Sequence, residues 1–178
     1  NSSTKKNNQI HKGEIQSLDE PVGNYIDSYN RDGKEDITIR QIMNMTSGLE
    51  FPSHEHEMMF FEENHLEYAL EVGVESTPGE KFQYNNVNSM LMGEILKSAT
   101  GKTAKELIEE RIFSQIGIRD YTAWEDSAGH TLTYCCLDMS ARDYSKFGLL
   151  FSRDGRWNDN QIISCLLYTS DAADDWFC

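Results

Sequence analysis

The stretch Thr77-Pro-Gly-Glu-Lys-Phe-Gln-Tyr-Asn-Asn-Val-Asn-Ser-Met-Leu-Met-Gly-Glu-Ile-Leu96 changes its apolar period halfway along its length. The Pro78-Gly79 pair is typical of a turn, because proline presets φ and glycine tolerates the next backbone conformation of the turn. Phe82 and Tyr84 are two apart, as in an extended segment whose alternate side chains share one side. Apolar residues then recur at helical spacing, so we predict a helix over 86–100.

The junction between the two periods brings a phenol and two carboxamides to one point, those of Tyr84, Asn85 and Asn86. A phenol can pass protons, and a carboxamide can both donate and accept a hydrogen bond. Taken alone, Tyr84 would more often be a half-buried aromatic residue whose hydroxyl is satisfied. Asn86 could equally serve as the N-cap of the helix that it precedes, a role that asparagine fills well.

Several further blocks accompany this junction along the chain. They are Gly13-Glu-Ile-Gln-Ser-Leu-Asp-Glu-Pro-Val22, Ile37-Thr-Ile-Arg-Gln-Ile-Met-Asn-Met-Thr-Ser-Gly-Leu49, the helix with Gly93-Glu94-Ile95, and Ser140-Ala-Arg-Asp-Tyr-Ser-Lys-Phe-Gly-Leu-Leu150. Together with Pro-Gly-x-x-Phe-x-Tyr-x-Asn, they resemble the serine β-lactamase-related hydrolases: class C β-lactamases, D-Ala-D-Ala peptidases, esterases and amide hydrolases. The similarity runs from about Lys12 to about Ile163, and the ordered blocks are far more specific than Tyr-x-Asn alone.

The resemblance implies a mainly α fragment of an α+β, β-lactamase/transpeptidase-like fold, with the sheet largely missing. The parent protein would hydrolyse amide or ester bonds of a small molecule through an acyl-enzyme, without a cofactor. Tyr84 would handle the proton together with a lysine, and Asn86 would bind the substrate's amide or position that lysine. A bacterial, periplasmic or extracytoplasmic location is implied. The alternative is a catalytically inactive fragment, or a non-catalytic relative that keeps the fold for binding.

The family's nucleophile is the serine of a Ser-x-x-Lys motif, in which one helical turn brings the lysine amine onto the hydroxyl. Ser2 and Lys5 have this spacing. However, Lys-Asn-Asn-Gln comes after Lys5 where resembling sequences have a long apolar helix, and without burial the lysine stays protonated at neutral pH. We interpret the pattern as a chance occurrence; a genuine catalytic pair is the alternative.

The chain is predicted to have three parts. Residues 1–11 form a damaged or disordered remnant, residues 12–163 form a partial β-lactamase-related domain, and residues 164–178 form a non-native tail. The run Cys165–Asp175 is the in-frame translation of DNA that resembles a transposase-type sequencing adapter. We therefore expect that the natural protein sequence differs from this one after about Ile163. The family's third motif, a Lys-Thr-Gly-like or histidine-containing strand, would lie beyond that point.

The composition narrows the possible partners. With 30 acidic and 16 basic side chains the net charge is −14, which argues against nucleic acid or an anionic membrane surface. No apolar run approaches the ~18–20 residues of a membrane span, and the polar N-terminus does not resemble a signal peptide. In a fragment, that absence says nothing of where the parent works. The sequence gives no indication of the oligomeric state.

The cysteines and histidines suggest no special site. Adjacent Cys135 and Cys136 are badly placed to bridge each other and are too few for zinc, so we predict no disulfide and no metal. His54, His56 and His65 lie in an acidic stretch but match no standard ligand spacing. We therefore expect these histidines in a solvated loop rather than in a metal site.

Three more helices are expected. Apolar spacing predicts a short helix within 38–45 that closes near Gly48. In the family, this block lies beneath the active-site cleft. Thr103-Ala-Lys-Glu106 and Ser140-Ala-Arg-Asp143 have capping patterns that predict the start of two others.

Overall fold

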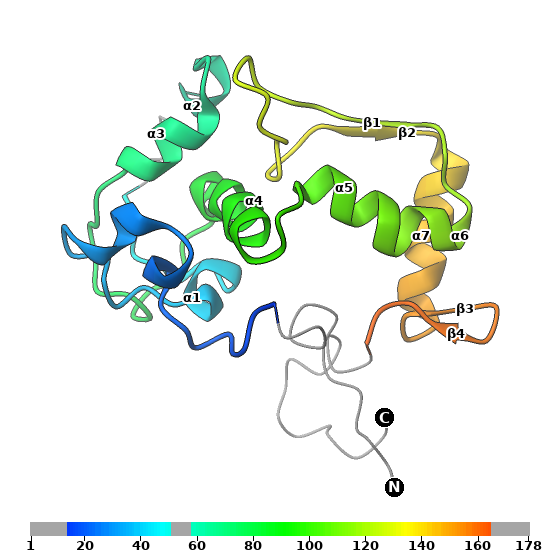
Figure 1. Ribbon diagram of the computed structural model, residues 1–178, viewed down its shortest axis with the longest axis horizontal. Coiled ribbons are helices and arrows are strands. Elements are labelled where there is room, and N and C mark those ends of the chain that lie inside the picture. Colours follow the sequence, from blue (N-terminus) through cyan, green and yellow to red (C-terminus); the bar gives the residue numbers. More distant parts are fainter. Residues whose placement is uncertain (1–13, 51–57, 165–178) are drawn as a thin grey trace, which may run out of the picture. The chain divides into compact units, whose positions relative to one another are not determined.

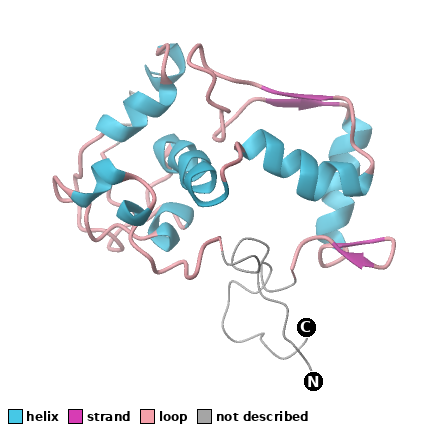
Figure 2. Cartoon of the chain, viewed as in Figure 1, coloured by secondary structure: helices cyan, strands magenta, loops and turns pink. Residues whose placement is uncertain are grey.

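The computed structural model of the chain describes residues 14–50 and 58–164 (Figure 1). Helices predominate, and within these residues the strands form only two small two-stranded sheets (Figure 2). The prediction of a mainly helical portion of an α+β fold is confirmed. The expected N-terminal remnant, with Ser2 and Lys5, lies outside the described residues, as do His54, His56 and the tail from Cys165 onward.

The chain divides into two compact units. One unit comprises Ser17–Lys105 and Ala123–Leu137, and the other comprises the described parts of Asn1–Gln16, Glu106–Thr122 and Asp138–Cys178. The helices of the first unit are η2 (Val22–Asn24), η3 (Asp27–Asn30), α1 (Ile39–Met43), α2 (Met58–Phe61), α3 (His65–Glu71) and α4 (Asn86–Thr100).

Helix α4 is the centre of the first unit, with α1 and α3 in contact with it (Figure 1). Its bounds, Asn86–Thr100, are those predicted from the apolar spacing. Gly101 ends it at φ 72° and donates its amide to the Lys97 carbonyl, as a left-handed C-terminal glycine does. Val87, Leu91 and Ile95 are fully excluded from solvent, so one face of the helix forms the core of this unit.

Helix α1 begins as predicted and ends earlier than predicted. The Thr38 hydroxyl accepts the Gln41 amide, and the Gln41 side chain accepts the Thr38 amide, which completes a capping box. The helix ends at Met43, and Met45 adopts a positive φ of 57°. The expected stop at Gly48 is therefore wrong, because the left-handed turn comes first at Met45.

Gly48 instead lies where two distant segments meet. The segment 45–50 runs beside 73–83, and Leu49 forms an antiparallel bridge with Val74. The amides of Glu50, Gly79 and Gln83 donate to the carbonyls of Gly73, Thr46 and Met45 at 2.8, 2.7 and 2.8 Å. This backbone ladder fixes the chain immediately before Tyr84.

The second unit contains most of a continuous helical run and one longer helix. Its elements are α5 (Ala104–Ile108, which begins in the first unit), the π-helical turn η5 (Glu109–Phe113), α6 (Ser114–Ile116), α7 (Ala141–Ser152) and the hairpin of β3 (Arg156–Trp157) with β4 (Asn160–Gln161). The Phe113 ring is buried against Tyr121 and Phe147, at centroid distances of 4.8 and 6.3 Å. Ser140 accepts the Asp143 amide and caps α7, which confirms that predicted start.

The other sheet pairs β1 (Tyr121–Ala123) with β2 (Leu137–Met139), and the division into units passes through both strands. Among the described helices, none combines the length and the apolar character that crossing a bilayer requires.

We expect Gly48→Ala to lower the free energy of unfolding by more than about 2 kcal/mol. Gly48 has φ 74°, and an added Cβ would clash with the Ser76 carbonyl oxygen, so both the backbone and the ladder would have to shift. Urea unfolding followed by circular dichroism would measure the loss.

Gly101→Ala is the matched control, since Gly101 has φ 72° but no atom within 4 Å of the added Cβ. Here only the left-handed backbone is strained, at a cost of about 1 kcal/mol. Equal losses in the two variants would contradict the proposed role of the close approach at Gly48.

Candidate functional site

Tyr84 projects from the junction between the ladder and α4. Tyr84 is 59% exposed, whereas the neighbouring Asn85 is 1% exposed. The amide of Gln83, one residue earlier, donates to the Met45 carbonyl at 2.8 Å. The phenol is thus presented to solvent from a backbone that is fixed on both sides.

Asn85 provides one side of this fixation. Its Oδ1 accepts the Val87 amide at 2.8 Å, and its Nδ2 donates to the Leu49 carbonyl at 3.3 Å. Asn85 is therefore the N-cap of α4. The alternative interpretation of Asn86 as the cap is wrong, because Asn86 is the first helical residue and is only half-buried.

Asn88 provides a second tie between α4 and the ladder segment 45–50. The Ser47 hydroxyl donates to Asn88 Oδ1 at 2.7 Å, and both residues are buried. Asn88 Nδ2 lies 3.4 Å from Met45 Sδ, a weak acceptor. Since a buried carboxamide is costly without partners, α4 holds one position relative to 45–49.

An open groove of about 390 Å³ adjoins this tie. Its lining residues come from α1, α4 and two nearby loops, and include Ile42, Met45, Asn88, Met92, Leu96 and Thr133. Most of these side chains are apolar. The groove therefore offers space beside the middle of α4 that the described residues do not fill.

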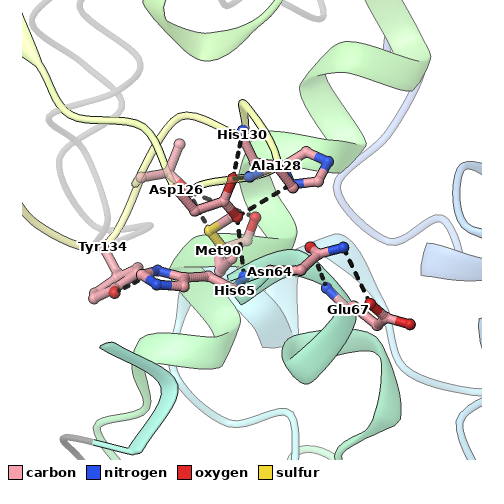
Figure 3. Close-up of polar contacts among 9 residues, drawn as sticks. Asn64, His65, Glu67, Met90, Asp126, Ala128, His130 and Tyr134 are labelled. Carbon is pink, nitrogen blue, oxygen red and sulfur yellow. Dashed lines mark hydrogen bonds and ion pairs between the residues drawn. The ribbon is translucent and has the colours of Figure 1, made fainter. Parts of the chain in front are cut away.

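A buried carboxylate ties the loop before β2 to α3 (Figure 3). Asp126 Oδ1 accepts the amides of Ala128 and His130, and Oδ2 accepts the His65 amide at 2.9 Å. His130 Nδ1 lies 3.1 Å from the same Oδ2. The Asp126 side chain is wholly excluded from solvent, so this network replaces its hydration.

His65 extends the network to the end of the same loop. It is 4% exposed, and its Nδ1 is hydrogen-bonded to the Tyr134 hydroxyl at 2.9 Å (Figure 3). The prediction of a solvated loop is thus wrong for His65, which begins α3 and lies in the core. Burial, reinforced by the charge of Asp126, raises the pKa of Tyr134 to about 12, so this phenol is neutral at physiological pH.

Thr133 attaches the loop to α4 itself. Its hydroxyl donates to the Ser89 carbonyl at 2.6 Å, and an added Cβ at Gly93 would meet the Thr133 side chain at 3.0 Å. Asp126, Thr133 and Tyr134 were not predicted from the sequence. The local Asp126-Ser-Ala-Gly pattern is a turn signal, but nothing local indicates that Asp126 would also receive the His65 amide.

The two adjacent cysteines of this loop form a disulfide, Cys135–Cys136, so the prediction of no disulfide is wrong. That prediction was based on the poor geometry that two adjacent cysteines offer for bridging each other. Cys136 instead has φ 68°, a left-handed backbone that brings the two side chains together. The catalytic roles of Tyr84 and Asn86 remain predictions.

We expect Asn85→Ala to lower the free energy of unfolding by about 1–2 kcal/mol, because it removes the cap of α4 and the partner of the Leu49 carbonyl. Asn86→Ala is the matched control, one residue away and expected to change stability by less than about 0.5 kcal/mol. Urea unfolding of both variants tests the assignment, and a larger loss for Asn86→Ala would reverse it.

Acid should weaken the network around Asp126. Burial raises the pKa of Asp126, but hydrogen bonds from His130 and from the His65 amide outweigh it, so the pKa lies below its usual 3.8. The folded state thus favours the ionised carboxylate, which stabilises fully above about pH 4 and is lost as pH falls through the lowered pKa. Unfolding free energies between about pH 6 and pH 2 should fall more steeply for the wild type than for Asp126→Asn.

Asp19→Asn is the control for this titration, because Asp19 also has a lowered pKa, through its hydrogen bond with Arg40 at the surface. Solvent screens that exposed pair, so its removal should change the acid dependence less. Parallel pH curves for the wild type and Asp126→Asn would show that Asp126 does not carry the expected linkage.

The fold has several relatives among solved structures. A protein from Bacillus anthracis provisionally assigned as a 6-aminohexanoate-dimer hydrolase has a TM-score of 0.79 and 24% identity, over 89% of this chain and 47% of that one. An octameric penicillin-binding protein homologue from Pyrococcus abyssi has a TM-score of 0.66 and 20% identity. That match covers 89% of this chain and 43% of the homologue. A D-stereospecific amidohydrolase from Streptomyces has a TM-score of 0.63 and 20% identity. That match covers 80% of this chain and 55% of the amidohydrolase.

The chain therefore spans about half the length of these structures. A comparison with curated protein sequences finds no match. The family model for β-lactamase matches residues 9–162, which is most of the chain and includes every block of the junction and the ladder. This chain belongs to the β-lactamase family.

Proposed function

We propose that the whole protein is a serine hydrolase that cleaves amide or ester bonds of small molecules through an acyl-enzyme. A serine oxygen would attack the carbonyl carbon, the bond to the leaving nitrogen or oxygen would break, and water would later release the acid. The support is family membership together with one feature of this chain, the exposed phenol of Tyr84 beside the start of α4.

Tyr84 suits a proton-transfer role because it combines exposure with a fixed backbone. The ladder fixes Gln83, and the buried hydrogen bonds of the cap fix Asn85. Tyr84 lies between these two residues, so its phenol has little freedom beyond its own side-chain rotations. Such preorganisation is what a group needs to meet a reacting atom repeatedly in one geometry. A purely structural tyrosine would gain more from burial of its ring.

Asn86 is proposed to bind the substrate or to orient the catalytic lysine. With Asn85 serving as the cap, the carboxamide of Asn86 is not needed for the helix start. Its position next to Tyr84 allows one substrate group to contact both side chains. An open groove further along the same helix, from Asn88 to Leu96, leaves room for a segment that the described residues do not supply.

The inclusion of amides among the proposed substrates is supported by two neighbours, a D-stereospecific amidohydrolase and a protein provisionally assigned as a 6-aminohexanoate-dimer hydrolase. Their identities of 20% and 24% support the fold and leave the individual substrate open.

The chain as it stands is proposed to be catalytically inactive. Ser2 and Lys5 have the spacing of a nucleophile and base, but the residues after Lys5 are polar, and an exposed lysine is protonated at neutral pH. A fluorescent phosphonate or a fluorescent penicillin would form a stable adduct with an activated serine and so reports this directly.

We expect no labelling of this chain, and labelling of a version completed with a full nucleophile helix and C-terminal strands. In the completed protein, Tyr84→Phe should slow labelling about 10²- to 10⁴-fold, the range for loss of a general acid or base. Phe82→Leu is the control, because Phe82 is 67% exposed nearby and has no proton to transfer.

Labelling of the present chain that Ser2→Ala abolishes would make Ser2 the nucleophile and refute the proposed inactivity. Equal labelling rates for the completed protein and its Tyr84→Phe variant would refute the role of Tyr84. Unfolding curves of the variants exclude a trivial effect on stability.

A further inference from the structure

The Cys135–Cys136 disulfide has no evident role as a cross-link. A disulfide stabilises mainly by closing a loop in the unfolded chain, and the gain falls as the loop shortens. Here no residue lies between the two cysteines, so the chain entropy that the bond removes is minimal. Its effect is local to the turn in which it lies.

That turn carries two attachments to the first unit's helices. Thr133 donates to the Ser89 carbonyl of α4 at 2.6 Å, and Tyr134 is bonded to His65 of α3 at 2.9 Å. On the other side of the disulfide, the Cys136 carbonyl accepts the Trp124 amide at 3.0 Å. The bond therefore lies between the attachments to the helices and the start of β2.

The disulfide lies at a left-handed position of this turn. Cys136 has φ 68°, a conformation that a residue with a Cβ adopts less readily than glycine, and the bond between the two side chains restrains it there. Once the sulfurs separate, the backbone at Cys136 can return to negative φ, and the direction of the preceding residues changes with it. Both cysteines are partly exposed, as an attacking thiolate requires.

We propose that Cys135–Cys136 is a site of thiol–disulfide exchange with small dithiols, and that its reduction releases Thr133 and Tyr134 from α4 and α3. A thiolate of the dithiol attacks one cysteine sulfur and forms a mixed disulfide, and the other cysteine leaves as a thiolate and takes up a proton. The second thiol then displaces the first cysteine. The protein gains two electrons and two protons, and the dithiol becomes a cyclic disulfide.

The exchange is independent of the proposed hydrolase activity, since it concerns the loop and the middle of α4. Its connection to the candidate site is structural. Thr133 contacts α4 at Ser89, one residue after the buried Asn88 that ties the same helix to Ser47. A redox change at the turn therefore acts on the helix that carries Asn86.

The test uses the full chain with Cys165→Ser and Cys178→Ser, so that all thiol chemistry belongs to the pair. Dithiothreitol is the probe dithiol, alkylation followed by mass spectrometry counts free thiols, and hydrogen exchange monitors residues 86–93 and 131–137. We expect no alkylation before reduction and labelling of both cysteines after it. Exchange in both segments should accelerate about fivefold on reduction, the factor for losing one hydrogen bond of ordinary strength.

Two variants separate the steps. Cys135→Ser with Cys136→Ser should exchange fast with or without dithiothreitol. Thr133→Val, which removes only the hydroxyl, should keep the redox effect in 131–137 and lose it in 86–93. Free thiols in the untreated, air-oxidised chain, or identical exchange rates before and after reduction, would overturn the proposal. That comparison on the unmodified cysteine pair is decisive even if the double serine variant does not fold.

Discussion

Two buried carboxamides at the start of α4 are the constraint on which the candidate site depends. Asn85 bonds both Val87 of α4 and Leu49, and Asn88 bonds Ser47 and Met45, so both carboxamides join α4 to the segment 45–49. A buried carboxamide without hydrogen-bond partners would lower the free energy of unfolding. The positions of the helix and of the segment therefore depend on each other. The exposed phenol and the half-buried amide of Asn86 owe their positions to this arrangement. Asn85 and Asn88 thus fix where the side chains of Tyr84 and Asn86 lie, the two residues proposed to act on the substrate.

The features predicted from the sequence are those that neighbours in the chain determine. The bounds of α4 result from apolar spacing and from Gly101, and the starts of α1 and α7 result from hydroxyl caps three residues before their partners. The family was predictable as well, because its blocks retain their order. The juxtaposition of Tyr84 and Asn86 was visible for the same reason, since the two residues are nearly adjacent.

The failures share a different cause, since each depends on a distant contact or on an unusual backbone. Gly48 resembled a helix stop, but its φ serves an approach to Ser76 that only the fold creates. His65 resembled a loop histidine, because nothing near it in sequence indicates Asp126 or Tyr134 as partners. The adjacent cysteines seemed unable to pair until Cys136 took a left-handed conformation. Tertiary hydrogen bonds, which no local pattern encodes, account for most of the features that could not be predicted.

The ladder also closes the chain between its two sides into a loop. The Glu50 amide donates to the Gly73 carbonyl at 2.8 Å, so this loop, which includes α2 and α3, begins and ends at the ladder. The entropic free-energy cost of closing a flexible loop grows slowly with its length, by only about 0.6 kcal/mol for each doubling. Insertions in this loop that spare α3 and its contacts with α4 would therefore cost little and leave the backbone under Tyr84 in place. The length of the chain between the two sides of the ladder can thus vary separately from the backbone that presents Tyr84.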